Sequence, residues 1–307
     1  MCDIIGDSSL IHRQAKEYFE LSPDKRCAPS KTYKDGSCIS TTHLEKIIAA
    51  YNKTQLPENI IDISDLPKHH TSHYRTLLVQ ILENKLSSIC SDQICWTKQS
   101  FIKFLDAETK NELLHNTFRP AGPKKQFEWL STIDINKVVV QYENKHPEFK
   151  FLGSEPIDFK THGFFNDYGD VSKLLNGLLK KGKTKCGLII NLDKHNQNGS
   201  HWVSLYFDLV NGLVYFSDSN GIAAPPQIKA FMREIEQFIR QKRGCEVVVK
   251  SNRTRHQNED SECGVYSINF ILRLLNGESF DNITRDKLPD RIVNKCRTVY
   301  FHNVNVK

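Results

Sequence analysis

The sequence predicts an α+β fold in which a mostly antiparallel central sheet is flanked by helices and preceded by a mainly helical N-terminal arm. Three apolar runs of strand length follow one another in the second half of the chain, at 186–192, 202–208 and 213–217. Segments whose apolar residues recur at helical spacing precede and follow these runs. Strands joined by hairpins with helices grouped around them are typical of α+β proteins.

The N-terminal third differs from the remainder of the chain. It is polar, and apolar side chains at helical spacing predict helices around 44–51 and 73–89. Proline and glycine at 119–124 break any helix and indicate a boundary. We therefore expect two domains, an arm at 1–115 and a core at 116–307.

Two helices and one strand open the core. Ser131 or Thr132 can cap the first helix, because a hydroxyl oxygen accepts from the unpaired N–H groups of a first turn. Pro147 ends that helix. A second helix over 171–180 leads into the strand at 186–192, which is apolar throughout and therefore predicted to be buried.

A hairpin and a long helix follow. Asn211-Gly212 separates the strands 202–208 and 213–217, and this dipeptide is a strong signal for a two-stranded hairpin. Apolar residues at helical spacing predict a helix over 226–243, and a short strand is predicted at 246–250. A polar loop then leads to the last helix of the core.

Composition describes an ordinary globular protein. The chain has 307 residues, of which 39% are hydrophobic and 25% charged. It contains neither an apolar run of about 18 residues nor a basic segment followed by an apolar N-terminal stretch, so we expect no membrane span and no signal peptide. The net charge of +6 is mild. We interpret its densest basic run, 180–185, as a solvated helix end, so nucleic-acid binding is only weakly supported.

The nine cysteines form no recognisable framework. Their odd number and their spacings predict neither a set of disulfides nor a zinc site. Cys90 and Cys95 are the closest pair, and we interpret them as reduced structural thiols. The chain is therefore expected to work in a reducing, intracellular setting, which a catalytic thiolate also requires.

Cys263 has the setting of a nucleophile. It follows a polar loop and precedes an apolar helical stretch that Asn276-Gly277 ends, so its sulfur is predicted at a helix N-terminus. The helix dipole favours thiolate over thiol there. The neighbouring Gly264 allows close approach of a substrate backbone. The alternative is a buried structural thiol, which lacks this combination of helix start, polar flank and glycine.

His201 is the candidate general base. It stands between the loop 196–200 and the strand that begins at Trp202, and imidazole titrates near neutral pH. His195 is the nearest competitor, and we interpret it as a loop residue. Trp202 can pack against the edge that carries His201 or fill the core.

Asp218 and Gln257 are ambiguous when taken alone. Asp218 ends a strand and could hold the imidazole in the required tautomer, or it could cap the turn 219–221. Gln257 stands six residues before Cys263 and could donate to a developing oxyanion, or it could be a solvated loop residue.

These residues together resemble a known family. The series His201-Trp202, Asp218-Ser219, Gln257 and Cys263-Gly264 is similar to the motif of the adenain and SUMO-protease clan of cysteine peptidases. The string 256–266 resembles the version found in large nucleocytoplasmic DNA viruses, as do 118–123 and 129–134. The segment 34–40 is similar to part of the N-terminal arm in members of the African swine fever virus type.

The resemblance implies an adenain/SUMO-protease-like core and a set of roles. His201, Asp218 and Cys263 would be the catalytic triad and Gln257 the oxyanion residue, with Trp202 and Gly264 beside the substrate. No metal or organic cofactor is implied. Viral members of the family cleave structural polyproteins after small residues, often Gly-Gly or Ala-Gly, during virion maturation.

Three functions follow as hypotheses. The first is a viral maturation endopeptidase that acts on polyproteins in the virus factory of the host cytoplasm and in the virion. The second is a protease that removes ubiquitin or a ubiquitin-like modifier, since these also end in Gly-Gly. The third is a non-catalytic scaffold, which the intact set of four residues disfavours. We also expect the arm to support activity by packing on the core or on substrate, because amphipathic helices need a surface that covers their apolar faces.

Overall fold

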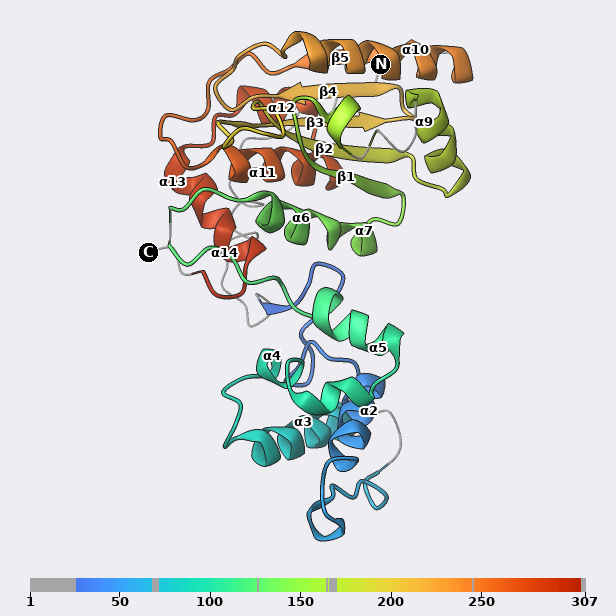
Figure 1. Cartoon of the computed structure of the whole chain (residues 1–307), viewed down its shortest axis with the longest axis vertical. Coiled ribbons are helices and arrows are strands. Elements are labelled where there is room, and N and C mark those ends of the chain that lie inside the picture. The colour runs from blue at the N-terminus through green and yellow to red at the C-terminus, as the bar shows by residue number, and fades with distance from the viewer. Residues whose placement is uncertain are drawn as a thin grey trace. The chain divides into compact units, whose positions relative to one another are not determined.

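The computed structural model describes residues 26–67, 72–125, 127–163, 165, 170–244 and 246–304 (Figure 1). The chain divides between Pro120 and Ala121 into two compact units. We call them the N-terminal unit and the core unit and describe each by itself.

The N-terminal unit is built from short helices around its own apolar core. Ser40 caps α2 by accepting from the backbone N–H of His43 at 3.2 Å. The apolar faces of α2 and α3 pack in one cluster, in which Leu44 and Leu82 are fully buried. These faces are thus covered inside the unit, so they do not by themselves require a second surface. The helices are α2 (Thr41–Asn52), η2 (Pro57–Asn59), α3 (Ser72–Leu86), α4 (Gln93–Trp96), η3 (Ser100–Phe104), α5 (Ala107–Asn111) and the π-helical turn η4 (Glu112–Asn116).

Two disulfides in this unit correct the cysteine prediction. Cys27 is bonded to Cys38, and Cys90 to Cys95, each pair with Cα atoms 5.4 Å apart. The prediction of reduced thiols was therefore wrong for these four residues. Sequence spacing alone does not indicate these bonds, because it is the turns of the fold that bring each pair into bonding distance. The described cysteines that stay free are buried and all belong to the core unit: Cys186, Cys263 and Cys296.

The core unit holds a mixed five-stranded sheet in the order β1-β2-β3-β4-β5 (Figure 1). The three inner strands are antiparallel to one another, and each edge strand pairs in parallel with the inner strand beside it. The strands are β1 (Phe149–Pro156), β2 (Lys185–Asn191), β3 (Trp202–Asp208), β4 (Leu213–Ser217) and β5 (Val248–Ser251).

Helices cover both faces of this sheet. One apolar cluster joins α9 and α10 to residues such as Leu205 and Phe216, and the other joins α6 and α11 to Ile189 and Tyr206. Every residue of β3 is therefore buried, although its side chains alternate between the two faces. The helices are α6 (Thr132–Val140), α7 (Tyr142–Lys145), α8 (Phe159–His162), α9 (Val171–Lys180), α10 (Pro226–Arg243), α11 (Cys263–Leu275), α12 (Phe280–Arg285), α13 (Asp290–Val293), η6 (Asn294–Cys296) and α14 (Arg297–Tyr300).

The structure confirms the predicted fold class and most predicted elements of the core. Ser131 caps α6 and forms a capping box with Asp134. The hairpin turns at Gly212, whose φ of 67° suits glycine. The strand β1 was not predicted. Its register shifts between Phe151 and Ser154 around Gly153, and this interrupts the alternation by which a strand is recognised.

None of the helices in the described ranges is long and apolar enough to cross a membrane.

Candidate functional site

His201 and Asp218 meet at one end of the β3–β4 hairpin. His201 directly precedes β3 and Asp218 directly follows β4, and the antiparallel register pairs Ser204 with Ser217. The two side chains are therefore brought together by the hairpin itself. His201 Nε2 lies 2.7 Å from Asp218 Oδ1, and the Asp218 side chain is only 2% exposed. The two side chains thus form a short hydrogen bond that the surrounding protein shields from water.

Opposing influences act on the pKa of His201. Burial of the ring is the largest and lowers it, but the hydrogen bonds from Asp218 and then Cys263, with the charges of both groups, outweigh burial. The pKa of His201 rises to about 9. The imidazolium is thus the favoured form of His201 at neutral pH.

Cys263 is the third member of this group. It is the first residue of α11 and is 2% exposed. Its side chain shares a hydrogen bond with His201. Because Asp218 holds Nε2 of the imidazole, Nδ1 is the ring nitrogen that remains for the thiol. The structure therefore brings Cys263, His201 and Asp218 into one connected chain of hydrogen bonds.

Gln257 is buried and tied to the turn that follows Asp218. Its Oε1 accepts from Ser219 Oγ at 2.6 Å, and its backbone N–H donates to the Ser219 carbonyl at 3.0 Å. Its Nε2 donates to the Glu259 carbonyl at 2.6 Å, which uses one of the two amide hydrogens. The loop before Cys263 is in this way fastened to the turn that carries Asp218. Gln257 as a whole is only 4% exposed, so it is not a solvated loop residue.

Trp202 and Gly264 pack with Leu130. Trp202 Nε1 donates to the Leu130 carbonyl at 3.0 Å, so the indole both fills the core and anchors this segment. A Cβ at position 264 would lie 3.1 Å from Leu130 Cβ and 3.4 Å from Trp202 Cδ1. A side chain at position 264 would therefore require Leu130 to shift by a few tenths of an ångström, directly beside Cys263.

Arg297 is a buried charge that the sequence reasoning missed. It is 1% exposed, and its guanidinium donates to the carbonyls of Glu128 and Ser261 and to Asn294 Oδ1, at 2.9, 2.9 and 3.0 Å. Burial lowers its pKa, against the opposing charges of Glu262 and others nearby. Arg297 thus joins the loop before α11 to the segment before Leu130. An arginine inside the mainly apolar stretch 296–301 was the available signal.

The basic run 180–185 is part of the fold of the sheet edge. Lys183 Nζ donates to the carbonyls of Pro147 and Phe149 at 2.8 and 3.1 Å, and Lys185 Nζ lies 3.0 Å from Glu148 Oε1. These two lysines bind the segment that leads into β1. This agrees with the interpretation of the run as a helix end.

One group of three side chains among the described residues has the chemistry of a metal site. It consists of Asp158, His162 and His195, and it contains none of the four predicted residues.

Comparison with known proteins places these features in context. The Ulp1 protease family, C-terminal catalytic domain, matches residues 187–305. The candidate thiol protease R355 of Acanthamoeba polyphaga mimivirus is 38% identical over 288 residues, which cover 90% of this chain and 93% of R355. The cysteine protease S273R of African swine fever virus (strain Badajoz 1971 Vero-adapted) is 23% identical over 240 residues, which cover 73% of this chain and 87% of S273R. The crystal structure of the African swine fever virus pS273R protease superimposes with a TM-score of 0.67 at 21% identity, covering 94% of this chain and 99% of that one.

Proposed function

This chain belongs to the Ulp1 protease family of cysteine peptidases, and we propose that Cys263, His201 and Asp218 are its catalytic triad. One observation carries the assignment. The imidazole of His201 is held by a buried carboxylate at 2.7 Å and shares a hydrogen bond with the thiol of Cys263. A nucleophile, a base and a group that orients the base are thereby linked in the order that thiol catalysis needs.

The proton moves along this chain of hydrogen bonds. His201 Nδ1 takes the proton of Cys263, and the sulfur attacks the carbonyl carbon of the scissile peptide bond. The imidazolium then gives its proton to the departing amine, and a thioester remains on Cys263. Water, deprotonated by His201, hydrolyses the thioester and restores the thiol. Asp218 keeps the ring oriented and stabilises the imidazolium throughout.

The oxyanion is stabilised by Gln257 and by the start of α11. The first N–H groups of a helix have no partner inside the helix, so the N–H of Cys263 can donate to the substrate oxygen. We assign the second donor to Nε2 of Gln257, one of whose hydrogens is bound to Glu259. Ser219 fixes the orientation of this amide by donating to its oxygen.

The substrate is proposed to carry small residues before the cleaved bond, of the Gly-Gly-X or Ala-Gly-X type. The surroundings of Cys263 support this, because a Cβ on the neighbouring Gly264 would lie only 3.1 Å from Leu130 Cβ and 3.4 Å from Trp202 Cδ1. Trp129, next in the chain to Leu130, is 44% exposed and offers an apolar surface to an extended backbone. Side chains beyond Cβ would compete for the same narrow space.

The biological substrate is proposed to be a viral structural polyprotein that is processed during virion maturation. Support comes from the extent of the similarity, because the relatives from mimivirus and African swine fever virus align well beyond the residues that match the family domain. A maturation protease has to act where particles assemble, so we place it in the virus factory of the host cytoplasm and in the virion. Electron microscopy of infected cells with a labelled antibody checks this location.

Cleavage of a peptide panel tests the proposed activity. Fluorogenic peptides of the forms Gly-Gly-X, Ala-Gly-X and Leu-Leu-X are incubated with the wild type, with Cys263→Ala and with Cys186→Ala, which removes a buried thiol on β2. We expect the wild type and Cys186→Ala to cleave the first two forms and Cys263→Ala to cleave none. Equal cleavage by Cys263→Ala would overturn the triad.

A second set of substrates separates polyprotein processing from modifier removal. Candidate structural polyproteins of the virus and fusions that end in ubiquitin or a ubiquitin-like protein are compared by kcat/KM, and the products are mapped by mass spectrometry. Faster processing of the modifier fusions would replace the polyprotein proposal by the modifier-removing alternative and leave the triad intact.

A further inference from the structure

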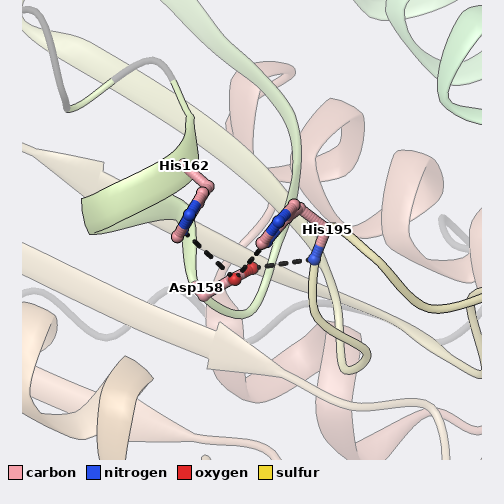
Figure 2. Close-up of side chains that lie close together, drawn as sticks. All are labelled: Asp158, His162 and His195. Carbon is pink, nitrogen blue, oxygen red and sulfur yellow. Dashed lines mark hydrogen bonds and ion pairs between the residues drawn. The ribbon is translucent and has the colours of Figure 1, made fainter.

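Asp158, His162 and His195 converge from two separate segments of the core unit (Figure 2). Asp158 directly precedes the short helix α8 and His162 is the last residue of that helix, whereas His195 lies in the loop between β2 and β3. One potential ligand atom from each residue lies within 4.8 Å of the others. Neither the proposed triad nor the oxyanion donors include any of them.

The carboxylate of Asp158 is the fixed point of the cluster. Its Oδ1 accepts from the backbone N–H of His195 at 2.9 Å, and its Oδ2 lies 2.6 Å from His195 Nδ1. The same Oδ2 lies 3.5 Å from His162 Nδ1. The Asp158 side chain is 17% exposed, so it is held in place while the two imidazoles reach outward from it.

The two imidazoles face each other closely. Their ring centroids are 3.8 Å apart and their planes differ by 10° (Figure 2). Parallel stacked rings cannot both direct an in-plane nitrogen lone pair at one ion, so ion binding requires the rings to tilt. Both side chains are nearly half exposed, at 49% and 42%, and χ rotation at the surface is inexpensive.

The local charge favours a cation. Lys160, the lysine of α8, is paired with Glu234 on α10 at 2.5 Å and is directed to that partner. A second carboxylate, Glu155, lies against Gly163, where a Cβ would overlap its Oε2. A carboxylate other than that of Asp158 thus lies against the residue that directly follows His162.

We propose that Asp158, His162 and His195 bind a divalent transition-metal ion of the zinc class. Imidazole nitrogen combined with one carboxylate oxygen suits Zn²⁺, Co²⁺ and Ni²⁺ better than Mg²⁺ or Ca²⁺, which prefer oxygen ligands. Three protein ligands leave the fourth position of a tetrahedral ion to water. The bound ion joins α8 to the β2–β3 loop, which continues to His201. This inference does not depend on the proposed triad.

Metal titration of the full chain without an affinity tag tests the site. The Cys263→Ala variant is used in the absence of thiol reductants, because a thiol–imidazole pair and dithiols bind zinc themselves. Zn²⁺ binding is followed by calorimetry and Co²⁺ binding by its visible absorption. We expect one saturable site for both ions, with no competition from a large excess of Mg²⁺.

Variants made in the same Cys263→Ala chain locate the ion. His162→Ala and His195→Ala each remove one ligand and are expected to weaken Zn²⁺ binding at least about tenfold. Asp158→Asn keeps an oxygen for the N–H of His195 while it removes the anionic ligand, so it separates loss of metal from loss of the local fold. His73→Ala, an exposed histidine of α3 in the N-terminal unit, is the matched control and should leave the affinity unchanged. No saturable binding, or equal affinity in all four variants, would overturn the proposal.

Discussion

Replacement of Asp218 by asparagine probes the electrostatics of the proposed triad most directly. The pKa of His201 stands at about 9 against an ordinary 6.5, which corresponds to about 3 kcal/mol of preference for the imidazolium. Asp218 contributes more of this preference than Cys263 does, through the larger hydrogen-bond and charge contributions. Asparagine keeps an oxygen near Nε2 but removes the charge. We therefore expect the pKa of His201 to fall to below about 8.

The pH profile of kcat/KM reports this change. In the wild type the imidazolium is retained up to about pH 9, so activity is expected to decline with an apparent pKa near that value. In Asp218→Asn the alkaline limb should move down by at least about one pH unit, and kcat/KM at pH 7.5 should fall by up to about tenfold as the pKa of His201 returns toward its ordinary value. Cleavage of a fluorogenic peptide is measured from pH 5 to pH 10, together with alkylation of Cys263 by iodoacetamide.

Asp208→Asn provides the control. Asp208 is equally buried and ends the same strand that His201 precedes, where it binds the backbone of the hairpin. Its replacement should lower stability without moving the alkaline limb. If Asp218→Asn keeps an alkaline limb near pH 9, the assignment of Asp218 as the group that raises the pKa of His201 is wrong.

The same pKa has a consequence for folding. Because the folded-state pKa of His201 is raised, its contribution of about 3 kcal/mol is fully present below pH 6.5 and is lost as the pH rises through about 9. Urea unfolding at these two pH values should show that loss in the wild type and a smaller one in Asp218→Asn.

Three other changes give independent checks. Gly264→Ala places a methyl group 3.1 Å from Leu130 Cβ and should cost about 1–3 kcal/mol of unfolding free energy together with most of the activity, measured by urea unfolding and peptide cleavage; full activity would contradict the packing argument. Replacing Cys27 and Cys38 by serine opens a loop with a sequence separation of 11 and should destabilise the N-terminal unit by about 3 kcal/mol, as seen by calorimetry with and without reductant; equal melting of the variant and the non-reduced wild type would count against that bond. Gln257→Ala should lower kcat about 100- to 1000-fold with little change in KM if its amide binds the oxyanion, and an unchanged kcat would remove that role.

Much of the proposed site follows from local sequence. Asn211-Gly212 predicts a hairpin, and an antiparallel hairpin brings the residue before its first strand close to the residue after its second. His201 and Asp218 occupy these two positions, so their meeting could have been expected from the turn alone. Cys263 was likewise found from the change between a polar loop and an apolar helix. Gln257 was not, because nothing local distinguishes it from a solvated glutamine.

The features that the sequence left open depend on segments far apart in the chain. The cysteine pairs, the Arg297 contacts and the group around Asp158 all require two or more segments to come within a few ångströms. Periodicity describes which face of an element is apolar, and it does not say which element covers that face. The strand β1 depends on both kinds of information. The register shift around Gly153 interrupts the alternation of side chains that sequence patterns detect, and parallel pairing with β2 is what defines the segment as a strand.

By itself the sequence predicted most of the core elements, β1 excepted, and the candidate residues for thiol chemistry, because helix starts, strand alternation and hairpin turns are set by near neighbours. Only the tertiary structure decided that two pairs of cysteines are bonded, that Gly264 is confined by Leu130 and Trp202, and that two histidines share one carboxylate. These are matters of distance between remote side chains, and such distances are fixed by packing of the whole unit.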